Sequence, residues 1–186
     1  MLVGCRRYTA RDPEFLQQNG IECWTLDIDF AATRWGAPGR HVIGAIEEAR
    51  SLFAPETFDT VVLSGVFGFG LDQIAAQDTA IAACASILKP NGVLALGWNV
   101  DRVADPSRLP SVAQCFRRCE QAEFARRVTF KGSTHVFDIY ALVRTAGCPS
   151  STDCGSALDQ SQDASGTNCS PAGTVTPGPV QRDAGA

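Results

Sequence analysis

Hydrophobic residues in the middle of the chain follow a pattern of strand, loop, helix, turn and strand over Phe58–Trp98. The run Thr60–Leu63 is continuous and largely β-branched, which predicts a strand buried on both faces of a parallel sheet. A helix is expected next, with Asp72 as its N-cap and its end before Pro90. Its apolar stripe consists of Ile74, Ile81, Ala85 and Leu88. Val93–Leu96 is the next predicted buried strand, so the stretch is a βαβ unit, and open α/β sheets bind ligands at the carboxyl ends of such strands.

The preceding part of the chain shows shorter patterns of the same kind. A strand at the start of the chain turns into a loop, and an Asp-Pro pair then marks the start of a short helix, which Asn19-Gly20 closes. The further expected elements are a second strand at Ile21–Ile28, a loop at Ala31–Arg40, a short third strand at His41–Gly44 and a helical turn at Glu47–Phe53.

After the central unit we expect a helix over Ser111–Arg127 and two strands, Arg127–Lys131 and Val136–Val143. The short turn between these strands predicts an antiparallel hairpin at the edge of the sheet. Four arginines of the helix could form an anion site, but the solvated face of a helix is the expected reading. They are Arg117, Arg118, Arg126 and Arg127.

The composition changes at the end of the folded part. Residues 147–186 hold six Gly, six Ser, four Pro and no aromatic residue. Such a segment buries too little apolar surface to offset the entropy of ordering. We therefore expect a folded domain at 1–146 and a disordered, low-complexity tail at 147–186.

The overall composition, 45% apolar and 19% charged, is typical of a globular protein. The net charge of -4 gives no basic excess, so nucleic acid is not the expected partner. No apolar run approaches the roughly 20 residues that span a membrane, and no signal peptide is recognisable, which predicts a cytoplasmic protein. The eight cysteines are expected to be thiols, and their spacing gives no metal site.

Asp27 and Asp29 stand at the end of the second predicted strand. A carboxylate at this place in a βαβ unit can accept hydrogen bonds from both hydroxyls of a ribose. The alternative is that these acids only cap the following segment. We favour the ribose role for Asp27 more than for Asp29.

The predicted fold class is α/β: a Rossmann-like, doubly wound, mostly parallel sheet with a C-terminal antiparallel hairpin, in three layers. This order of elements, over residues 1–144, resembles a class I S-adenosylmethionine-dependent methyltransferase. The most specific stretches of the resemblance are Leu26–Asp29, Phe58–Val62 and Leu88–Leu94, the last of which looks like the family's turn before the fifth strand.

The resemblance implies that S-adenosylmethionine is the cofactor. It places the glycine loop at the start of the chain, the ribose acid at the end of the second strand, the adenine contacts after the third strand and further contacts after the fourth. The implied cofactor-binding residues are Gly4, Cys5, Asp27, Ile28, Ala45, Ile46, Ser64, Gly65 and Val66.

The sequence departs from the family pattern at several positions. The loop that begins at Gly4 continues with Arg6, which restricts the backbone and places a cation near the cofactor's sulfonium. Leu2 replaces the usual acid before the loop. Ala45 replaces the usual aspartate at the adenine position, although Glu47 is near enough to substitute. The helices that precede the first strand in the family are missing, which implies a truncated or minimal N-terminus.

The expected acceptor is a small molecule, because the region after the fourth strand lacks the family's Asn-Pro-Pro-Tyr type of motif. The candidate substrate contacts are Phe67, Phe69, Trp98 and Asn99; for the aromatic residues the alternative is that they complete the core. No base is assigned among His135, Asp138 and Tyr140. A non-catalytic or truncated methyltransferase-fold binding module is the rival function. A nicotinamide-dependent oxidoreductase is a weaker rival, since its G-x-G-x-x-G loop is missing.

Overall fold

The structure is a computed structural model that describes residues 1–119 and 127–143. The strands of this part are β1 (Leu2–Val3), β2 (Thr25–Asp27), β3 (His41–Ile43), β4 (Phe58–Ser64), β5 (Leu88–Asn99), β6 (Phe116–Arg118), β7 (Val128–Thr129) and β8 (His135–Leu142). The helices are α1 (Asp12–Gln18), α2 (Ala49–Leu52), α3 (Ile74–Ile87) and α4 (Pro110–Cys115), with 3₁₀ turns η1 (Arg7–Thr9), η2 (Phe30–Trp35), η3 (Ile46–Glu48) and η4 (Pro106–Arg108).

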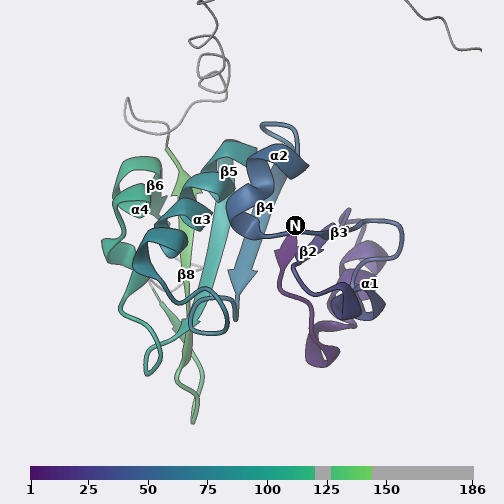
Figure 1. The fold of residues 1–186 in the computed structure, drawn as a ribbon, viewed down its shortest axis with the longest axis horizontal. Coiled ribbons are helices and arrows are strands. Elements are labelled where there is room, and N and C mark those ends of the chain that lie inside the picture. Colours follow the sequence, from purple (N-terminus) through teal and green to yellow (C-terminus); the bar gives the residue numbers. More distant parts are fainter. Residues whose placement is uncertain (120–126, 144–186) are drawn as a thin grey trace, which may run out of the picture. The chain divides into compact units, whose positions relative to one another are not determined.

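The strands form one mixed sheet in the order β3-β2-β1-β4-β5-β8-β6, with β7 also paired to β8 (Figure 1). The pairs from β3 to β5 are parallel, while β8 runs antiparallel to β5, β6 and β7. This confirms the predicted α/β class and the reversed C-terminal strand. The prediction that the hairpin forms the sheet edge is wrong for β8, because β8 lies between β5 on one side and β6 and β7 on the other.

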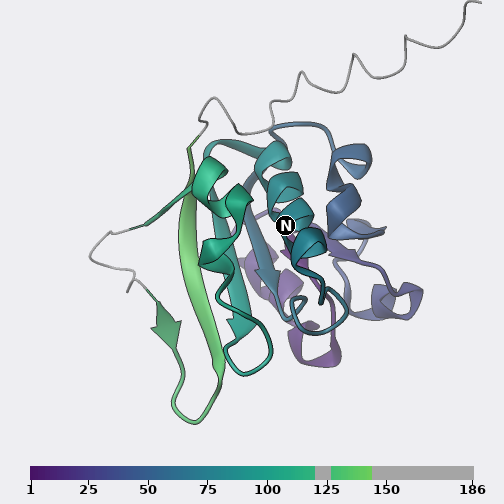
Figure 2. The same cartoon turned by 60° about the vertical axis from the view of Figure 1, so that its left-hand side comes forward.

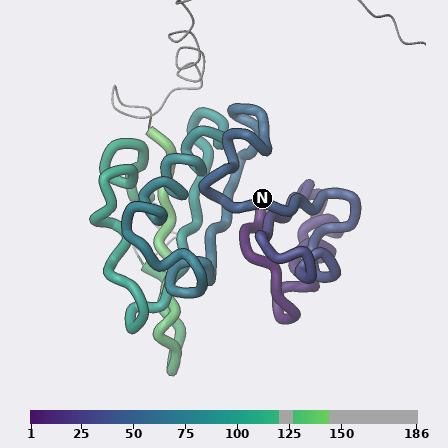
Figure 3. The backbone as a smooth tube through the Cα atoms, in the orientation of Figure 1, coloured from purple at the N-terminus to yellow at the C-terminus, as the bar shows by residue number. Residues whose placement is uncertain are grey.

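Helices α2, α3 and α4 pack together over one face of the sheet (Figure 2). The connection from β1 to β2 steps along the sheet in the opposite direction to that from β4 to β5 (Figure 3). Since such crossovers are right-handed, α1 lies on the other face from α3. Alternate residues of β8 are buried under the helices, and those between them are half-buried. Among the described residues, this other face of β4, β5 and β8 is therefore only partly covered.

Strand β4 shows the same one-sided burial. Val61 and Leu63 are buried in the core, whereas Thr60 is exposed and Val62 is half-buried. The prediction that Thr60–Leu63 is buried on both faces is therefore wrong. A β-branched run favours a strand, but the packing of the neighbouring elements decides how many of its faces are covered.

Helix α3 begins one residue later than predicted. Its N-cap is Gln73, and Asp72 is exposed outside the helix. Ile74, predicted in the apolar stripe, is 65% exposed, while Ile81 and Ala85 are buried. The shift follows from the loop before the helix, which is closed by hydrogen bonds such as that from the side chain of Gln77 to the carbonyl of Leu71 (2.9 Å).

The predicted turn after α3 forms a bulge at the start of β5. The pairing with β4 jumps from Phe58–Leu88 to Thr60–Val93, so that Lys89–Gly92 bulge out of the ladder. Asn91 has a φ of 62°, in the left-handed region that asparagine tolerates. The turn chemistry was therefore predicted correctly, although the strand extends on both sides of it.

The predicted helix at Ser111–Arg127 is wrong for Phe116–Arg118, while residues 120–126 lie outside the described part of the chain. Phe116–Arg118 form β6 along β8, and the ring of Phe116 packs edge-on against Tyr140 with centroids 6.4 Å apart. Arg118 pairs with the buried carboxylate of Asp138 (2.6 Å). These tertiary partners outweigh a helical pattern that is only partly apolar.

Three further outcomes concern element bounds, membrane-spanning helices and residues that the structure does not describe. Strand β2 is shorter than predicted, and the predicted loop at Ala31–Arg40 contains most of the 3₁₀ turn η2. None of the described helices is long and apolar enough to cross a membrane. Arg126 and the predicted tail at 147–186 lie outside the described residues.

Candidate functional site

A pocket lies at the carboxyl ends of β1 to β4, the edge at which the sequence places ligand-binding loops. The space inside it is about 580 Å³, a figure that includes the open solvent at its mouth. Its lining residues are Val3, Gly4, Arg6, Leu26, Asp27, Ile28, Gly44, Ala45, Ile46, Glu47, Gly65, Val66, Phe69, Gly70 and Leu71. Of the nine residues predicted to bind cofactor, all except Cys5 and Ser64 line this pocket.

Gly4 gives the loop after β1 a conformation that other residues rarely adopt. Its φ is 88°, and a Cβ added there would lie 3.3 Å from the carbonyl oxygen of Ser64. A side chain at this position would therefore crowd Ser64 and Val66, and glycine avoids that. Because Gly4 is the only glycine of its loop, a ligand could approach the backbone closely at this one residue only.

Asp27 is the acid at the end of β2, and it is 5% exposed. Its Oδ2 accepts hydrogen bonds from the backbone N–H of Cys5 (2.6 Å) and from Nη1 of Arg6 (2.8 Å). Its Oδ1 accepts one from the backbone N–H of Asp29 (2.8 Å). A carboxylate offers about four lone-pair directions, so one direction at Oδ1 is not used by these donors.

Arg6 brings a cation into the pocket. Its side chain is 45% exposed, and Nη1 bridges the Asp27 carboxylate and the carbonyl of Cys5 (2.7 Å). Arg6 was predicted in the cofactor loop, but its pairing with Asp27 was not predicted. This pairing could have been inferred from the expected adjacency of β1 and β2. Neighbouring parallel strands end at the same edge of the sheet, which brings Arg6 and Asp27 close together.

Cys5 is not a reactive group of the site. Burial, followed by the charge of Asp27, raises the pKa of its thiol to about 11. The side chain is 2% exposed and contributes only its backbone to the hydrogen bond with Asp27. Together with Cys23, Cys84 and Cys119 it is a free thiol, as predicted.

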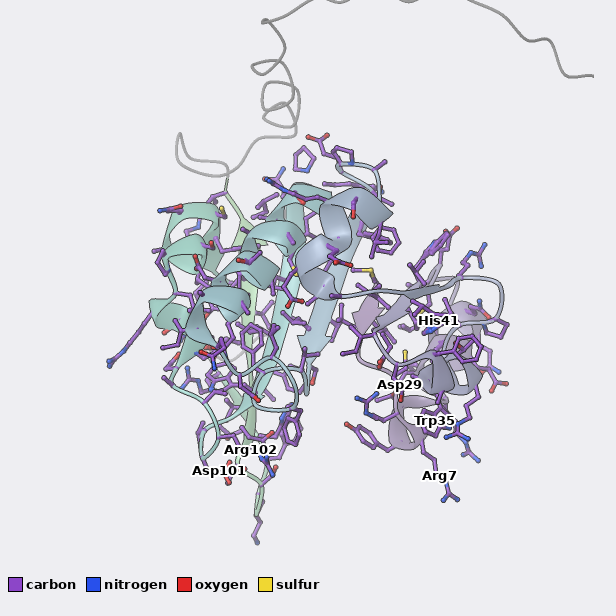
Figure 4. All side chains as sticks on the ribbon, viewed as in Figure 1. Arg7, Asp29, Trp35, His41, Asp101 and Arg102 are labelled. Atoms are coloured by element: carbon purple, nitrogen blue, oxygen red, sulfur yellow. The ribbon has the colours of Figure 1, made fainter. Side chains whose placement is uncertain are left out.

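Asp29 caps the following segment. Its Oδ1 accepts a hydrogen bond from the backbone N–H of Ala31 (2.8 Å) at the start of η2. This is the capping alternative, and it agrees with the preference for Asp27 as the binding residue. In Figure 4, Asp29 and Arg7 mark the segments that follow β2 and β1.

The predicted adenine contacts form an apolar side of the pocket. Ile46 is buried, whereas Ile28 is 68% exposed at the mouth. Ala45 and Ile46 begin the turn η3, which also brings Glu47 into the lining. Glu47 therefore lies near enough to substitute for the aspartate that Ala45 replaces at the adenine position.

The predicted aromatic substrate contacts do not all reach the pocket. Phe69 lines the pocket at 47% exposure, with the guanidinium of Arg102 4.3 Å from its ring centroid. Figure 4 places Arg102 in the loop that follows β5. Phe67 and Trp98 are each 1% exposed, so the structure supports their alternative role as core residues.

Ser64 and Asn99 lie outside the pocket lining. Both contact His135, a residue to which no role was assigned from the sequence. The antiparallel direction of β8 was the missed signal, because it returns the start of that strand to the ends of β4 and β5.

Two of the four predicted arginines, Arg118 and Arg127, are held in ion pairs and belong neither to a solvated helix face nor to an open anion site. Arg118 and Arg127 both pair with Asp138, which is fully buried. Arg127 also pairs with Asp105 (2.9 Å) and lies over the Trp98 ring. Within residues 1–119 and 127–143, no group of three or more side chains could hold a metal ion.

Comparisons with known proteins match the structure and not the sequence. No model of a known protein family matches the chain, and no curated protein matches its sequence. Solved structures do match. The TehB-like SAM-dependent methyltransferase of Corynebacterium glutamicum is similar over 76% of this chain and 79% of its own, with 19% identity and a TM-score of 0.55.

Two other solved structures carry bound ligands. The 1,6-didemethyltoxoflavin-N1-methyltransferase of Burkholderia thailandensis, with S-adenosylhomocysteine, covers 77% of this chain and 71% of its own at 16% identity and a TM-score of 0.54. The 16S rRNA methyltransferase RsmC of T. thermophilus, with AdoMet and guanosine, covers 73% of this chain and 32% of its own at 17% identity and a TM-score of 0.50. This chain therefore has the fold of the class I S-adenosylmethionine-dependent methyltransferases.

Proposed function

We propose that this protein is an S-adenosylmethionine-dependent methyltransferase that acts on a small molecule. The observation that carries the proposal is the pocket at the ends of β1 to β4. It combines a left-handed glycine, Gly4, with the carboxylate of Asp27 and an apolar side, in a fold whose known members include structures with S-adenosylhomocysteine.

The residues of the pocket fit the cofactor. Asp27 would hold the ribose through the remaining lone pair of Oδ1, and Gly4 would let the backbone approach the amino-acid end. The other lining residues proposed to bind cofactor are Ile28, Ala45, Ile46, Gly65 and Val66. The cofactor, when bound, supplies a methyl group on an activated sulfonium.

The acceptor is proposed to approach beside Phe69, whose half-exposed ring gives the pocket an apolar wall. Positioning of the acceptor can supply much of the rate of an in-line displacement. An RNA acceptor, as in one of the similar structures, is disfavoured by the net charge of -4.

Titration calorimetry with S-adenosylmethionine and S-adenosylhomocysteine tests the proposal. Binding of both by the wild-type protein is expected, with affinity at least tenfold lower in Asp27→Ala, since a hydrogen bond to a charged group is worth roughly 1.5–3 kcal/mol. Asp59→Ala is the matched control, because Asp59 pairs with Lys89 and lies outside the pocket lining. Equal affinities in the two variants would remove Asp27 from the proposal.

A second candidate function is a non-catalytic binding module with this fold. The Arg6–Asp27 ion pair favours it, because the pair uses the carboxylate that the cofactor needs. No heat with either ligand, from the wild-type protein and from Arg6→Ala, would establish this second candidate over the first.

A further inference from the structure

Three polar side chains meet where β4 and β5 end and β8 begins. The hydroxyl of Ser64, the last residue of β4, lies 3.2 Å from Nε2 of His135. Nδ1 of the same ring lies 3.2 Å from Oδ1 of Asn99, the last residue of β5. A hydroxyl, an imidazole and an orienting group are thus connected in a row.

The hydrogen bonds around Asn99 assign the proton on the imidazole. In the amide orientation of this structure, Nδ2 of Asn99 donates to Oγ1 of Thr134 (2.8 Å) and Oδ1 of Asn99 faces Nδ1 of His135. Nδ1 of His135 must then carry the hydrogen and donate it. Nε2 is left with a free lone pair, which accepts the hydrogen bond of the Ser64 hydroxyl. This is the tautomer that a general base requires.

Gly97 makes the contact between Ser64 and His135 possible. It lies between them in the sheet, where it pairs with Ser64 on β4 and with Phe137 on β8. A Cβ at this position would lie 2.8 Å from the Ser64 hydroxyl oxygen and 2.9 Å from Nε2 of His135. Any larger residue would therefore separate the hydroxyl from the imidazole.

The surroundings suit a neutral base next to an apolar ligand. Burial lowers the pKa of His135, and both of its hydrogen-bond partners are uncharged. The ring of Phe137 stands edge-on to the imidazole at 4.8 Å between centroids. Phe130, 49% exposed, stacks edge-on to Phe137.

A half-buried apolar strip continues along the same face of the sheet. Val62, Ala95 and Ile139 lie side by side on β4, β5 and β8, two residues from Ser64, Gly97 and Phe137 respectively. Because side chains alternate along a strand, these residues share the face of the Ser64 hydroxyl. An apolar chain could lie along this strip and present its carbonyl to Ser64.

We propose that Ser64 is a nucleophile toward carboxylic esters with an apolar acyl group, with His135 as its general base and Asn99 as the positioning residue. The arrangement of nucleophile, base and orienting group is the signature of such a site. None of the three residues lines the cofactor pocket, so the proposal does not depend on the methyltransferase function.

The reaction would proceed in two balanced steps. The Ser64 oxygen bonds to the carbonyl carbon, its proton moves to Nε2 of His135, and the imidazolium returns that proton to the departing alkoxide. Water then attacks the acyl-serine in the same way and releases the carboxylic acid.

Covalent labelling of the full chain tests the proposal without knowledge of the natural ester. An alkyl fluorophosphonate bonds through phosphorus to a reactive serine and releases fluoride. Intact mass and peptide mapping should locate one adduct at Ser64, and p-nitrophenyl butyrate should be hydrolysed faster than the acetate. Ser51→Ala is the matched control for Ser64→Ala, because Ser51 is an exposed serine on α2.

The other variants separate a nucleophile from a structural hydrogen bond. His135→Gln should slow labelling at least 100-fold, within the 10²–10⁴ range of general-base catalysis, and Gly97→Ala should abolish it by wedging the pair apart. Asn99→Asp should accelerate labelling by stabilising the imidazolium. In the wild-type protein the rate should fall as the pH drops below the lowered pKa of His135.

Circular dichroism and thermal melting identify any variant that fails to fold, and Asn99→Asp and Ser51→Ala remain informative if Gly97→Ala does fail. No adduct at Ser64 in the folded wild-type protein, or a labelling rate that His135→Gln and Asn99→Asp leave unchanged, would overturn the proposal. The Ser64–His135 contact would then be only a link between β4 and β8.

Discussion

Asp27 and Asp138 are the buried aspartates of the described part of the chain, and each pairs with arginine. Asp138 lies in the middle of β8 and is fully buried. Its carboxylate accepts hydrogen bonds from Arg118, Arg127 and the hydroxyl of Tyr140. Asp27 lies at the end of β2, on the wall of the pocket, and has a single arginine partner that is 45% exposed.

The difference separates a structural ion pair from one that a ligand could replace. Both oxygens of Asp138 are held by arginine, and Arg127 is held in turn by Asp105. At Asp27 only Oδ2 faces an arginine, while Oδ1 accepts a single backbone N–H. Arg6 can move into water at little cost. We therefore expect the ion pairs of Asp138 to support the fold and the Arg6–Asp27 pair to control access to the pocket.

The largest expected effect is on folding. Asp138→Asn should lower the free energy of unfolding by about 3 kcal/mol, because it leaves two arginines beside a buried site that has lost its charge. Urea denaturation measures the loss. Asp101→Asn, at an exposed position in the loop after β5, should change stability by less than about 0.5 kcal/mol. Similar losses in the two variants would contradict a structural role for Asp138.

The same substitution at Asp27 should cost less. Asp27→Asn keeps an oxygen for the Cys5 backbone N–H and loses mainly the charge-assisted bond from a partly exposed arginine. The expected loss in urea denaturation is about 1 kcal/mol. A loss as large as that of Asp138→Asn would show that the Arg6–Asp27 pair is also structural and remove the contrast between the two sites.

Arg6→Ala tests the comparison through the affinity for the ligand. Removal of the competing cation should strengthen binding of S-adenosylmethionine about fivefold, which corresponds to about 1 kcal/mol for a partly exposed ion pair. S-adenosylhomocysteine lacks the sulfonium charge and should gain less. Calorimetry with both ligands measures the two changes, and Arg7→Ala, which removes an exposed arginine one residue away, is the control. An equal gain for both ligands would exclude charge repulsion as the cause.

The smallest effect concerns the pH dependence of the Asp105–Arg127 pair. Burial raises the pKa of Asp105, but hydrogen bonds from Arg127 and Ser107 outweigh it and leave the pKa below its ordinary value. A carboxyl with a lowered pKa stabilises the fold above its unfolded pKa of about 3.9, and the stabilisation is lost as the pH falls through the lowered value.

Asp105→Asn should therefore cost less than about 1 kcal/mol at pH 7 and at pH 5, since the pair is partly exposed. The difference from the wild-type protein should shrink below pH 4. Urea denaturation at these pH values measures it. A difference that grows toward low pH would show the opposite sign of linkage and contradict the assignment.

The firmest sequence predictions concern elements that short-range patterns define. The βαβ unit, the turn before Val93, the short third strand and the place of Asp27 at the end of the second strand all follow from local spacing and turn chemistry. The structure has the predicted α/β fold, and most of the proposed cofactor residues line one pocket. Local patterns suffice here because they involve residues of one element and its neighbouring loops.

The sequence by itself therefore determined the fold class and the edge of the sheet that carries the pocket. Only the tertiary structure decided that Arg6 pairs with Asp27, that Arg118 leaves the predicted helix to reach Asp138, and that His135 joins Ser64 to Asn99. These contacts connect residues 20 to 71 positions apart. Their partners depend on which strands become neighbours and in which direction β8 runs, and no periodicity along the chain records that.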